Sequence, residues 1–223
     1  MQRVFDIFIS GIALIILLPL MIPLVILLRL TGEGEVFFKQ LRVGFEGSRF
    51  EIYKFATMLK DSPNIGAGTL TMKNDVRVLP VGKFLRKTKI NELPQLLNIL
   101  LGDMSLVGPR PLVPDGEINY TADQTKIIRS VIPGVTGIGS LVLRDEESYY
   151  AHRTDAQDFY RNVISPFKAS LEIWYVENKS FMLNLKIIFV TIIAIIKPTW
   201  NAADFFSTAP RISDKMIESK LIK

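Results

Sequence analysis

One arginine in this sequence is held in a stiff loop and could bind an anionic substrate. Arg110 stands between Pro109 and Pro111, whose rings fix φ and restrict the backbone on both sides. A guanidinium presented by such a loop suits bidentate binding of a phosphate group. Taken alone, an arginine in a proline turn is more often part of a structural ion pair, so both interpretations stay open.

The supply of metal-binding side chains restricts the metal chemistry. The sequence has no cysteine and only one histidine, His152, to which no role is assigned. This excludes disulfides, thiolate catalysis, and cysteine-based or multi-histidine metal sites. A divalent metal would have to use oxygen ligands, which favours magnesium.

A short acidic motif opens a segment with a helical pattern. In residues 89–101, KINELPQLLNILL, four leucines repeat at helical spacing, which predicts a helix with one buried stripe: Leu93, Leu96, Leu97 and Leu100. Asn91 stands where an asparagine commonly caps a helix, and Glu92 follows at the positive end of the helix dipole. Without further information, the pair is a cap and a favourably placed acid.

The N-terminal segment Ile7–Leu28 is apolar, carries no charged residue and includes Pro19 and Pro23. A straight helix over it would span about 33 Å, close to the ~30 Å hydrocarbon core of a bilayer. Pro19 removes one backbone hydrogen bond and crowds the preceding turn, so a break is expected there. Because Arg3 and Arg29 flank the segment, a re-entrant hairpin that returns to the same side would keep both basic ends in the cytoplasm, and this interpretation stays open. A single kinked span is the alternative.

The middle of the chain alternates apolar and polar residues. Residues 35–44 and 49–58 predict a β-hairpin, with Phe50, Ile52 and Phe55 on the buried side. Further along, residues 81–87 form a short, basic amphipathic segment, and the sequence predicts a helix over 115–129 and a glycine-rich loop over 133–140.

Two more helices are predicted near the C-terminus. Residues 165–178 predict a helix with Trp174 and Tyr175 at the headgroup level. Residues 181–196 are apolar but short for a span, which favours a helix lying in the membrane interface. The predicted organisation is a membrane hairpin (1–30), a catalytic domain (31–198) and a polar tail (199–223), in a mostly helical α+β protein.

The charge balance points to membranes or phosphates. Lys and Arg outnumber Asp and Glu by 27 to 22, which gives a net charge of +5. With an apolar anchor present, this surplus suits an anionic lipid surface or a phosphate-bearing substrate. No nucleic-acid-binding signature accompanies it.

The segment KFLRKTKINELPQLLNILLGDMSLVGPRPL, Lys83–Leu112, resembles the signature of the bacterial sugar transferase family. These are monotopic phosphoglycosyltransferases, which move a sugar 1-phosphate from a nucleotide sugar to polyprenyl phosphate. The likeness includes the proline-broken N-terminal segment, FEIYKFATM (50–58), PGVTGIG (133–139) and WYVENKSFMLNLKIIF (174–189). The length is that of the family's minimal catalytic unit.

The resemblance implies a transferase of polysaccharide biosynthesis on the cytoplasmic face of the bacterial inner membrane. The implied substrates are a UDP-sugar and polyprenyl phosphate, the implied products are UMP and polyprenyl-diphosphate-sugar, and the implied cofactor is Mg²⁺. Such a protein would take the first membrane step of a glycoconjugate pathway and could form a homo-oligomer. A catalytically inactive adaptor docked on the membrane is the alternative, and a single-span protein with a soluble binding domain is a third reading.

In the resembled family an Asp-Glu pair opens the leucine-rich helix. The Asp is taken to attack phosphorus, and the Glu helps to hold magnesium; here the pair falls on Asn91 and Glu92. An amide has no anionic oxygen and is a poor nucleophile. Attack by Glu92, replacement by Asp145, direct attack by polyprenyl phosphate and an inactive chain all stay open.

The resemblance assigns phosphate contacts to Arg110, Lys54 and Arg144, and places Arg110 near Glu92. The sequence also departs from the family at Ala56 and Ile132, where relatives often carry a basic residue, and at Leu18, where many have serine. The acids that follow Arg144, residues 145–147, are either carboxylates behind the site or the first turn of a helix.

Overall fold

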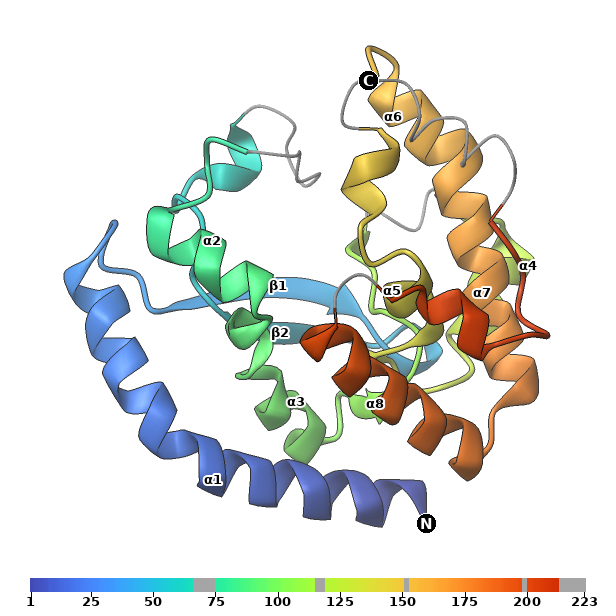
Figure 1. Cartoon of the computed structure of the whole chain (residues 1–223), viewed down its shortest axis with the longest axis horizontal. Coiled ribbons are helices and arrows are strands. Elements are labelled where there is room, and N and C mark those ends of the chain that lie inside the picture. The colour runs from blue at the N-terminus through green and yellow to red at the C-terminus, as the bar shows by residue number, and fades with distance from the viewer. Residues whose placement is uncertain (66–74, 115–118, 151–152, 198–199, 213–223) are drawn as a thin grey trace. The chain divides into compact units, whose positions relative to one another are not determined.

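The computed structural model describes residues 1–65, 75–114, 119–150, 153–197 and 200–212 of the chain (Figure 1). His152 lies outside these residues. The chain divides into two compact units: residues 1–41 with 51–104, and residues 42–50 with those from 105 onward. The described part is mostly helical with two small sheets, which confirms the predicted α+β class.

The N-terminal segment of the first unit is one helix, α1 (Gln2–Leu30), which continues through Pro19 and Pro23. Figure 1 shows that α1 bends along its length, but no loop interrupts it at Pro19. Among the described residues, α1 is the one helix long and apolar enough to cross a membrane. Only 11% of its most apolar stretch is buried, so α1 is not the core helix of a soluble domain. The re-entrant arrangement stays a prediction.

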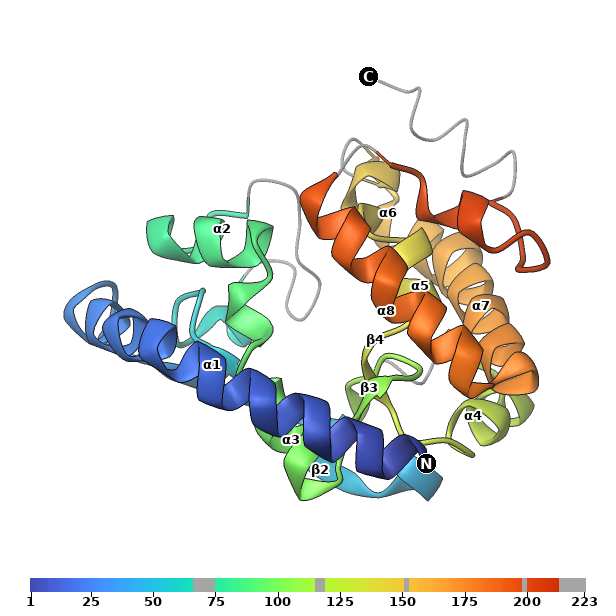
Figure 2. The same ribbon diagram turned by 60° about the horizontal axis from the view of Figure 1, so that its bottom comes forward.

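Both ends of α1 contact the first unit. Near its start, the Arg3 guanidinium donates to the carbonyl of Leu100 at 2.9 Å and also to that of Ile99, at the end of α3 (Gln95–Leu101). Near its end, Leu28 packs in an apolar cluster with Phe55 and Leu85. Figure 2 shows α1 running along α3.

The predicted β-hairpin is confirmed. Strands β1 (Phe37–Val43) and β2 (Arg49–Phe55) pair in a two-stranded sheet, joined by the 3-10 turn Phe45–Gly47. The three apolar side chains expected on the buried side of the second strand are buried: Phe50, Ile52 and Phe55. In the turn, Glu46 and Gly47 adopt positive φ, which a glycine accommodates without strain.

The segment after the basic helix α2 (Pro80–Lys87) differs from the prediction. The expected continuous helix over 89–101 is a 3-10 turn, Ile90–Glu92, followed by the seven-residue α3. The leucine stripe is not the buried face: Asn98 is fully buried, whereas Leu97 is 44% exposed. The reason is that the Asn98 side chain bonds to the backbone of β2, which turns this polar face inward.

The predicted helix cap at Asn91 is also wrong. Asn91 lies inside the 3-10 turn, which begins after Lys89 in the left-handed region (φ 61°), and no side chain caps that turn. The α3 helix begins after Pro94, again without a side-chain cap. Asn91 is therefore buried for a reason other than capping.

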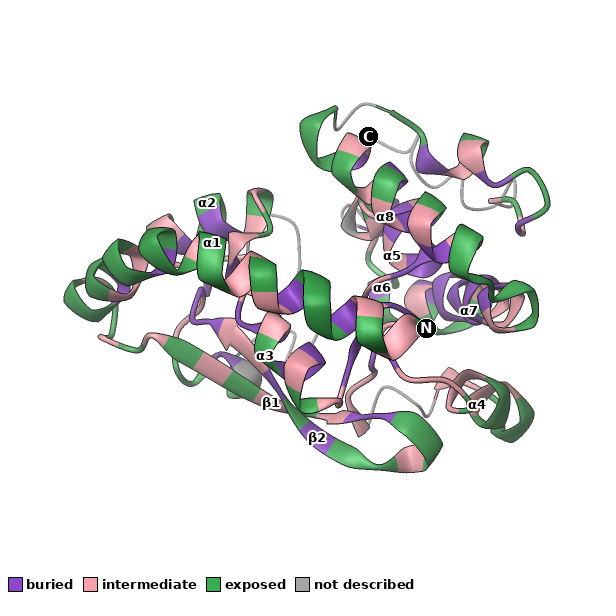
Figure 3. Cartoon of the chain, turned by 90° about the horizontal axis from the view of Figure 1, so that it is seen from below, coloured by how far each residue is buried: buried purple, intermediate pink, exposed green. Residues whose placement is uncertain are grey.

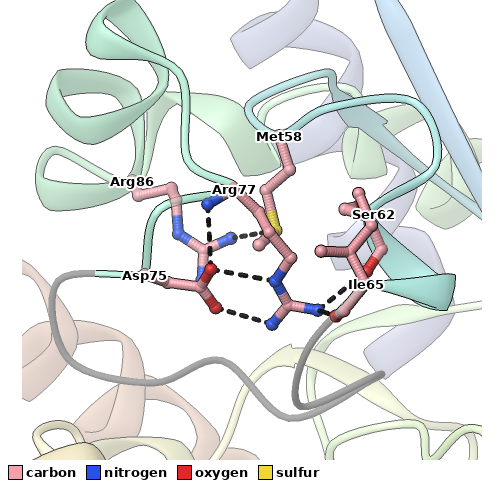
Figure 4. A network of polar contacts seen from close by, with 6 residues as sticks. All are labelled: Met58, Ser62, Ile65, Asp75, Arg77 and Arg86. Carbon is pink, nitrogen blue, oxygen red and sulfur yellow. Dashed lines mark hydrogen bonds and ion pairs between the residues drawn. The ribbon is translucent and has the colours of Figure 1, made fainter.

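A buried arginine holds the chain together on both sides of residues 66–74 (Figure 4). Arg77 is 3% exposed and pairs with Asp75 at 2.6 Å. Its Nη1 atom donates to the carbonyls of Ser62, at 2.7 Å, and Ile65, at 2.9 Å. Bonding to Asp75 raises the pKa of Arg77, so this guanidinium stays charged and acts as a structural clamp.

In the second unit, two segments that are far apart in the sequence pair as strands. Strand β3 (Ser105–Val107) pairs in parallel with β4 (Gly134–Thr136), with Ser105 opposite Gly134. The predicted glycine-rich loop is therefore partly a strand. Helix α4 (Ala122–Ile128) is shorter than the predicted 115–129, begins with a capping box at Thr121, and is preceded by residues 115–118, which are not described.

Helices follow to the end of the described chain: α5 (Ile138–Val142), α6 (Ala156–Phe159), a π turn (Tyr160–Ile164), α7 (Ser165–Asn178) and α8 (Phe181–Ile196). The predicted bounds of α7 and α8 are confirmed. Helix α5 packs against both of them (Figure 2).

Tyr175 does not face a membrane interface as predicted. Its side chain is fully buried, and its hydroxyl donates to Asn184 Oδ1 at 2.8 Å and to the carbonyl of Val107 at 3.2 Å. Trp174 instead packs edge-to-face on Phe206. The hydroxyl has partners in the core, which makes burial of this tyrosine favourable.

Helix α8 is mostly apolar but buries one side only. Ile187 and Val190 are buried, whereas Met182 and Ile196 are more than 70% exposed. Figure 3 shows exposed and buried positions alternating along α8. Beyond α8, the described part of the predicted polar tail is packed: Phe206 and Ala209 are buried after the 3-10 turn Ala202–Phe205.

Candidate functional site

The structure brings two of the predicted site residues together in the first unit. Lys54 comes from β2, and Glu92 ends the 3-10 turn before α3. The Nζ atom of Lys54 lies 3.4 Å from Oε1 of Glu92, and each side chain is 14% exposed. A partly buried pair of this kind is screened less by solvent than a surface pair.

The buried amide of Asn98 sets the relation between β2 and α3. Its Oδ1 atom accepts from the Tyr53 backbone N–H at 3.0 Å, and its Nδ2 donates to the Glu51 carbonyl at 2.7 Å. Because Tyr53 directly precedes Lys54 on β2, the contact fixes the lysine relative to the helix that follows Glu92. Sequence periodicity missed this residue, because its pattern favoured the leucines.

Asn91 lies beside this pair in the chain and is 7% exposed. Its Oδ1 atom is buried without a hydrogen-bond partner among the described residues. Leaving a buried amide oxygen unsatisfied costs about 1–3 kcal/mol, so such an atom calls for a role. A neutral amide can orient a bound group, but it cannot supply an anionic nucleophile.

Glu92 fits a magnesium site only if the substrate supplies other ligands. No group of three or more acidic, histidine or cysteine side chains that could hold a metal occurs among the described residues. Magnesium commonly uses one or two carboxylates together with substrate phosphates and water. The partly buried Glu92 meets that requirement as one protein ligand.

Arg110 lies in the second unit, in the loop after β3. The amide of Gly108 donates to the Thr136 carbonyl at 3.0 Å, and that of Gly134 donates to the Pro109 carbonyl at 2.9 Å. The two backbones approach so closely that a methyl group at Gly108 would lie 2.7 Å from the amide nitrogen of Gly134. The glycines of the two motifs therefore permit the contact that fixes the loop of Arg110.

Arg110 also lines a small pocket formed within the second unit. Its lining includes the hairpin tip at Val43 and Gly44, together with Tyr120 and Arg129. Burial raises the pKa of Tyr120 well above its ordinary value, so this phenol stays neutral. The pocket is lined by two residues with guanidinium groups suited to phosphate, Arg110 and Arg129, beside neutral and apolar groups.

A buried acid that the sequence did not single out lies against the backbone of Arg110. Glu172 on α7 is 2% exposed, and its Oε1 atom accepts from the Arg110 backbone N–H at 3.4 Å. Burial raises the pKa of Glu172 to about 7. Lys168, Glu172 and Tyr175 recur on one side of α7, so helical periodicity was the signal that could have found them.

The remaining predicted residues have other contacts. The Arg144 guanidinium donates to the carbonyl of Ala194, near the end of α8. Asp145 is exposed, whereas Glu146 pairs with the buried Lys168 at 2.9 Å. Glu146 begins a short 3-10 helix, Glu146–Tyr149, which agrees with the interpretation of these acids as the start of a helix.

Similarity to known proteins agrees with these motifs. Residues 1–198 match the family described as bacterial sugar transferase. The chain belongs to this family. It is 38% identical over 193 residues to the uncharacterized sugar transferase EpsL of Bacillus subtilis. The matched region covers 86% of this chain and 85% of that protein.

Two further members of the family show how widely the similarity extends. The undecaprenyl-phosphate glucose phosphotransferase of Komagataeibacter xylinus is 36% identical over 86% of this chain, which spans only 35% of that longer protein. The exopolysaccharide production protein ExoY of Rhizobium meliloti is 32% identical over 87% of this chain and 84% of its own length.

Proposed function

We propose that this sugar transferase moves a sugar 1-phosphate from a UDP-sugar to undecaprenyl phosphate or a similar polyprenyl phosphate. The family membership and the acceptor named for the Komagataeibacter relative support this reaction. The observation that carries it is the Lys54–Glu92 pair, which lies at the motif to which the family's chemistry is assigned. The pathway would be the assembly of an exopolysaccharide or another glycoconjugate.

Glu92 would bind Mg²⁺ together with the diphosphate of the donor, and Lys54 would add positive charge beside it. When bound, Mg²⁺ offsets the charge that develops on the leaving UMP. Arg110 would bind a phosphate through its guanidinium, which Pro109 and Pro111 hold in place. Arg144 would have to release the Ala194 carbonyl before it could take a similar role.

The covalent step implied by the resemblance cannot be carried onto Asn91. We therefore assign the attack to the polyprenyl phosphate itself: its oxygen bonds to the phosphorus that bears the sugar. The bond from that phosphorus to the bridging oxygen breaks, and UMP leaves with the electron pair. The amide of Asn91 orients a phosphate oxygen through its N–H groups.

The proposed location is the cytoplasmic face of the bacterial inner membrane, with α1 as a re-entrant element. The contacts of Arg3 with the end of α3, and of Leu28 with the apolar cluster, support this arrangement, because both ends of α1 bind the same unit. The exposed apolar side chains of α8 suit a helix that lies in the membrane interface.

The test is UMP release by the full chain in lipid nanodiscs, with Mg²⁺ and a panel of UDP-sugars. We expect release only when polyprenyl phosphate is present. No release from any donor would refute the enzymatic function.

A second candidate function is supported by the asparagine at the nucleophile position, which suits an inactive adaptor that binds donor or partner without turnover. Glu92→Gln separates the two. An enzyme loses turnover in this variant, whereas an adaptor shows no turnover before or after the change and keeps its binding.

A further inference from the structure

Glu172 is a buried acid with no place in the proposed chemistry. It lies on α7, 2% exposed, and its Oε2 atom is buried without a hydrogen-bond partner among the described residues. An isolated buried carboxyl group is costly, and hydrophobic residues of similar size would pack there without that cost. Its presence therefore calls for a contact that an apolar side chain could not make.

That contact is with the loop of Arg110. Oε1 of Glu172 accepts from the Arg110 backbone N–H at 3.4 Å. The arginine lies between two prolines, so its N–H is the one backbone donor in the Pro109–Pro111 segment. A side chain that accepts a hydrogen bond from this N–H can therefore hold the segment from an element that is not part of the β3–β4 pairing.

The glycine-rich segment leaves room for the carboxyl group. A methyl group at Gly139 would lie 3.0 Å from the Glu172 carboxyl carbon and closer still to Oε1. The absence of a side chain at Gly139 thus lets the carboxyl group of α7 reach the Arg110 loop.

The charges around Glu172 come from its own helix and from the loop of Arg110. On its own helix, Lys168 is paired with Glu146 at 2.9 Å. Burial raises the pKa of Glu172; the hydrogen bond from the Arg110 backbone, then the charge of Lys168 and that of Arg110, lower it by less. Tyr120, the titratable group before α4, is neutral because burial raises its pKa. Glu172 therefore lies near two positive charges, Lys168 and Arg110, and bonds to the backbone of Arg110.

We propose that Glu172 is a positioning residue for Arg110: it holds the Arg110 backbone from α7 and so fixes where the guanidinium meets the phosphates of the donor. This inference rests on the proposed function, since the donor is what Arg110 would bind. Glu172 itself touches no substrate.

The test combines amide hydrogen exchange over residues 105–112 with steady-state kinetics on the full chain in nanodiscs. In Glu172→Ala we expect faster exchange in this segment and a KM for the UDP-sugar raised about tenfold, the equivalent of roughly 1.4 kcal/mol, with a smaller change in kcat. Glu172→Gln keeps an acceptor oxygen and should restore both values. Glu177→Gln, an exposed acid on the same helix, is the matched control and should behave as the unmodified chain.

Gly139→Ala supplies an independent perturbation, because it displaces the carboxyl group without removing it. We expect it to reproduce the Glu172→Ala defect alone, and to add little when combined with Glu172→Ala. Unchanged exchange in Glu172→Ala, faster exchange with an unaltered KM, failure of Glu172→Gln to rescue, or fully additive effects would each overturn the proposal. If the unmodified chain shows no turnover, the proposed function fails, while the exchange data still decide whether Glu172 holds the loop.

Discussion

Lys54 and Glu92 form a partly buried ion pair, with 3.4 Å between Nζ and Oε1 and 14% of each side chain exposed. The lysine belongs to a strand and the acid to the turn before a short helix, and they are brought together by the Asn98 contacts with the β2 backbone. This pair is the part of the site that the structure defines most directly.

Removing the lysine should leave the acid without its neighbouring charge. We expect Lys54→Met to lower kcat/KM by about 10- to 100-fold. The substitution removes a positive charge that would attract the phosphates of the donor, and it removes the contact that positions Glu92. Lys39→Met is the control, since this residue pairs with Glu51 on the exposed face of the same hairpin. Equal effects of the two substitutions would show that the partly buried pair has no special role.

Asn98→Ala should destabilise the first unit. The substitution leaves the Tyr53 N–H and the Glu51 carbonyl without their partner, at a cost of about 1–3 kcal/mol for each group. Thermal unfolding in detergent should therefore shift to a lower Tm, and turnover should fall with it. Leu97→Ala on the same helix, where the side chain is 44% exposed, should change Tm much less.

Glu172 should make stability depend on pH near neutrality. Its pKa is about 7 in the folded protein, whereas an unperturbed glutamate has a pKa near 4.3. The folded state binds more protons than the unfolded state between these values, so stability falls as pH rises through that window and levels off above about pH 7. Glu172→Gln should raise Tm relative to the unmodified chain at about pH 8 but not at about pH 4. A Tm difference that does not change with pH would contradict this assignment.

Asn91→Asp tests whether an aspartate at residue 91 is enough to restore the family's covalent step in this chain. We expect the unmodified chain to show sequential kinetics and no sugar-phosphate adduct, because an amide supplies no attacking anion. The aspartate variant should yield a trapped adduct at residue 91 by mass spectrometry. An adduct at Glu92 or Asp145 in the unmodified chain would contradict the direct attack proposed above.

A tag at Met1 shows on which side of the membrane the N-terminus lies. If α1 is re-entrant, the tag should react with a membrane-impermeant reagent only after the cells are opened. A tag at the C-terminus is the control for the cytoplasmic side. Labelling of the Met1 tag in intact cells would establish a span and defeat the re-entrant model.

The elements with a strong local pattern were predictable from the sequence. The bounds of α7 and α8 and the buried face of β2 follow from periodicity alone. The face of α3 was not predictable, because a tertiary contact of Asn98 overrode the leucine pattern. Tyr175 was misplaced for a similar reason: its hydroxyl finds Asn184 on α8, a partner that no local pattern indicates.

The site was predictable only in part. Motifs identified Glu92, Lys54 and Arg110, and the structure places the first two in contact. Glu172 was missed because it stands in an otherwise ordinary helix and acts through the backbone of Arg110, 62 residues away in the chain. Such a pairing depends on the β3–β4 contact and on the glycines that permit it.

The most direct test of the central claim follows the phosphorus itself. A UDP-sugar with radioactive phosphorus in the β position is incubated with the chain in nanodiscs that contain polyprenyl phosphate, and the lipid is then extracted. We expect the label to enter the lipid together with the sugar, in the unmodified chain but not in Glu92→Gln. Label that stays wholly in the aqueous phase, or enters the lipid equally in Glu92→Gln, would contradict the account.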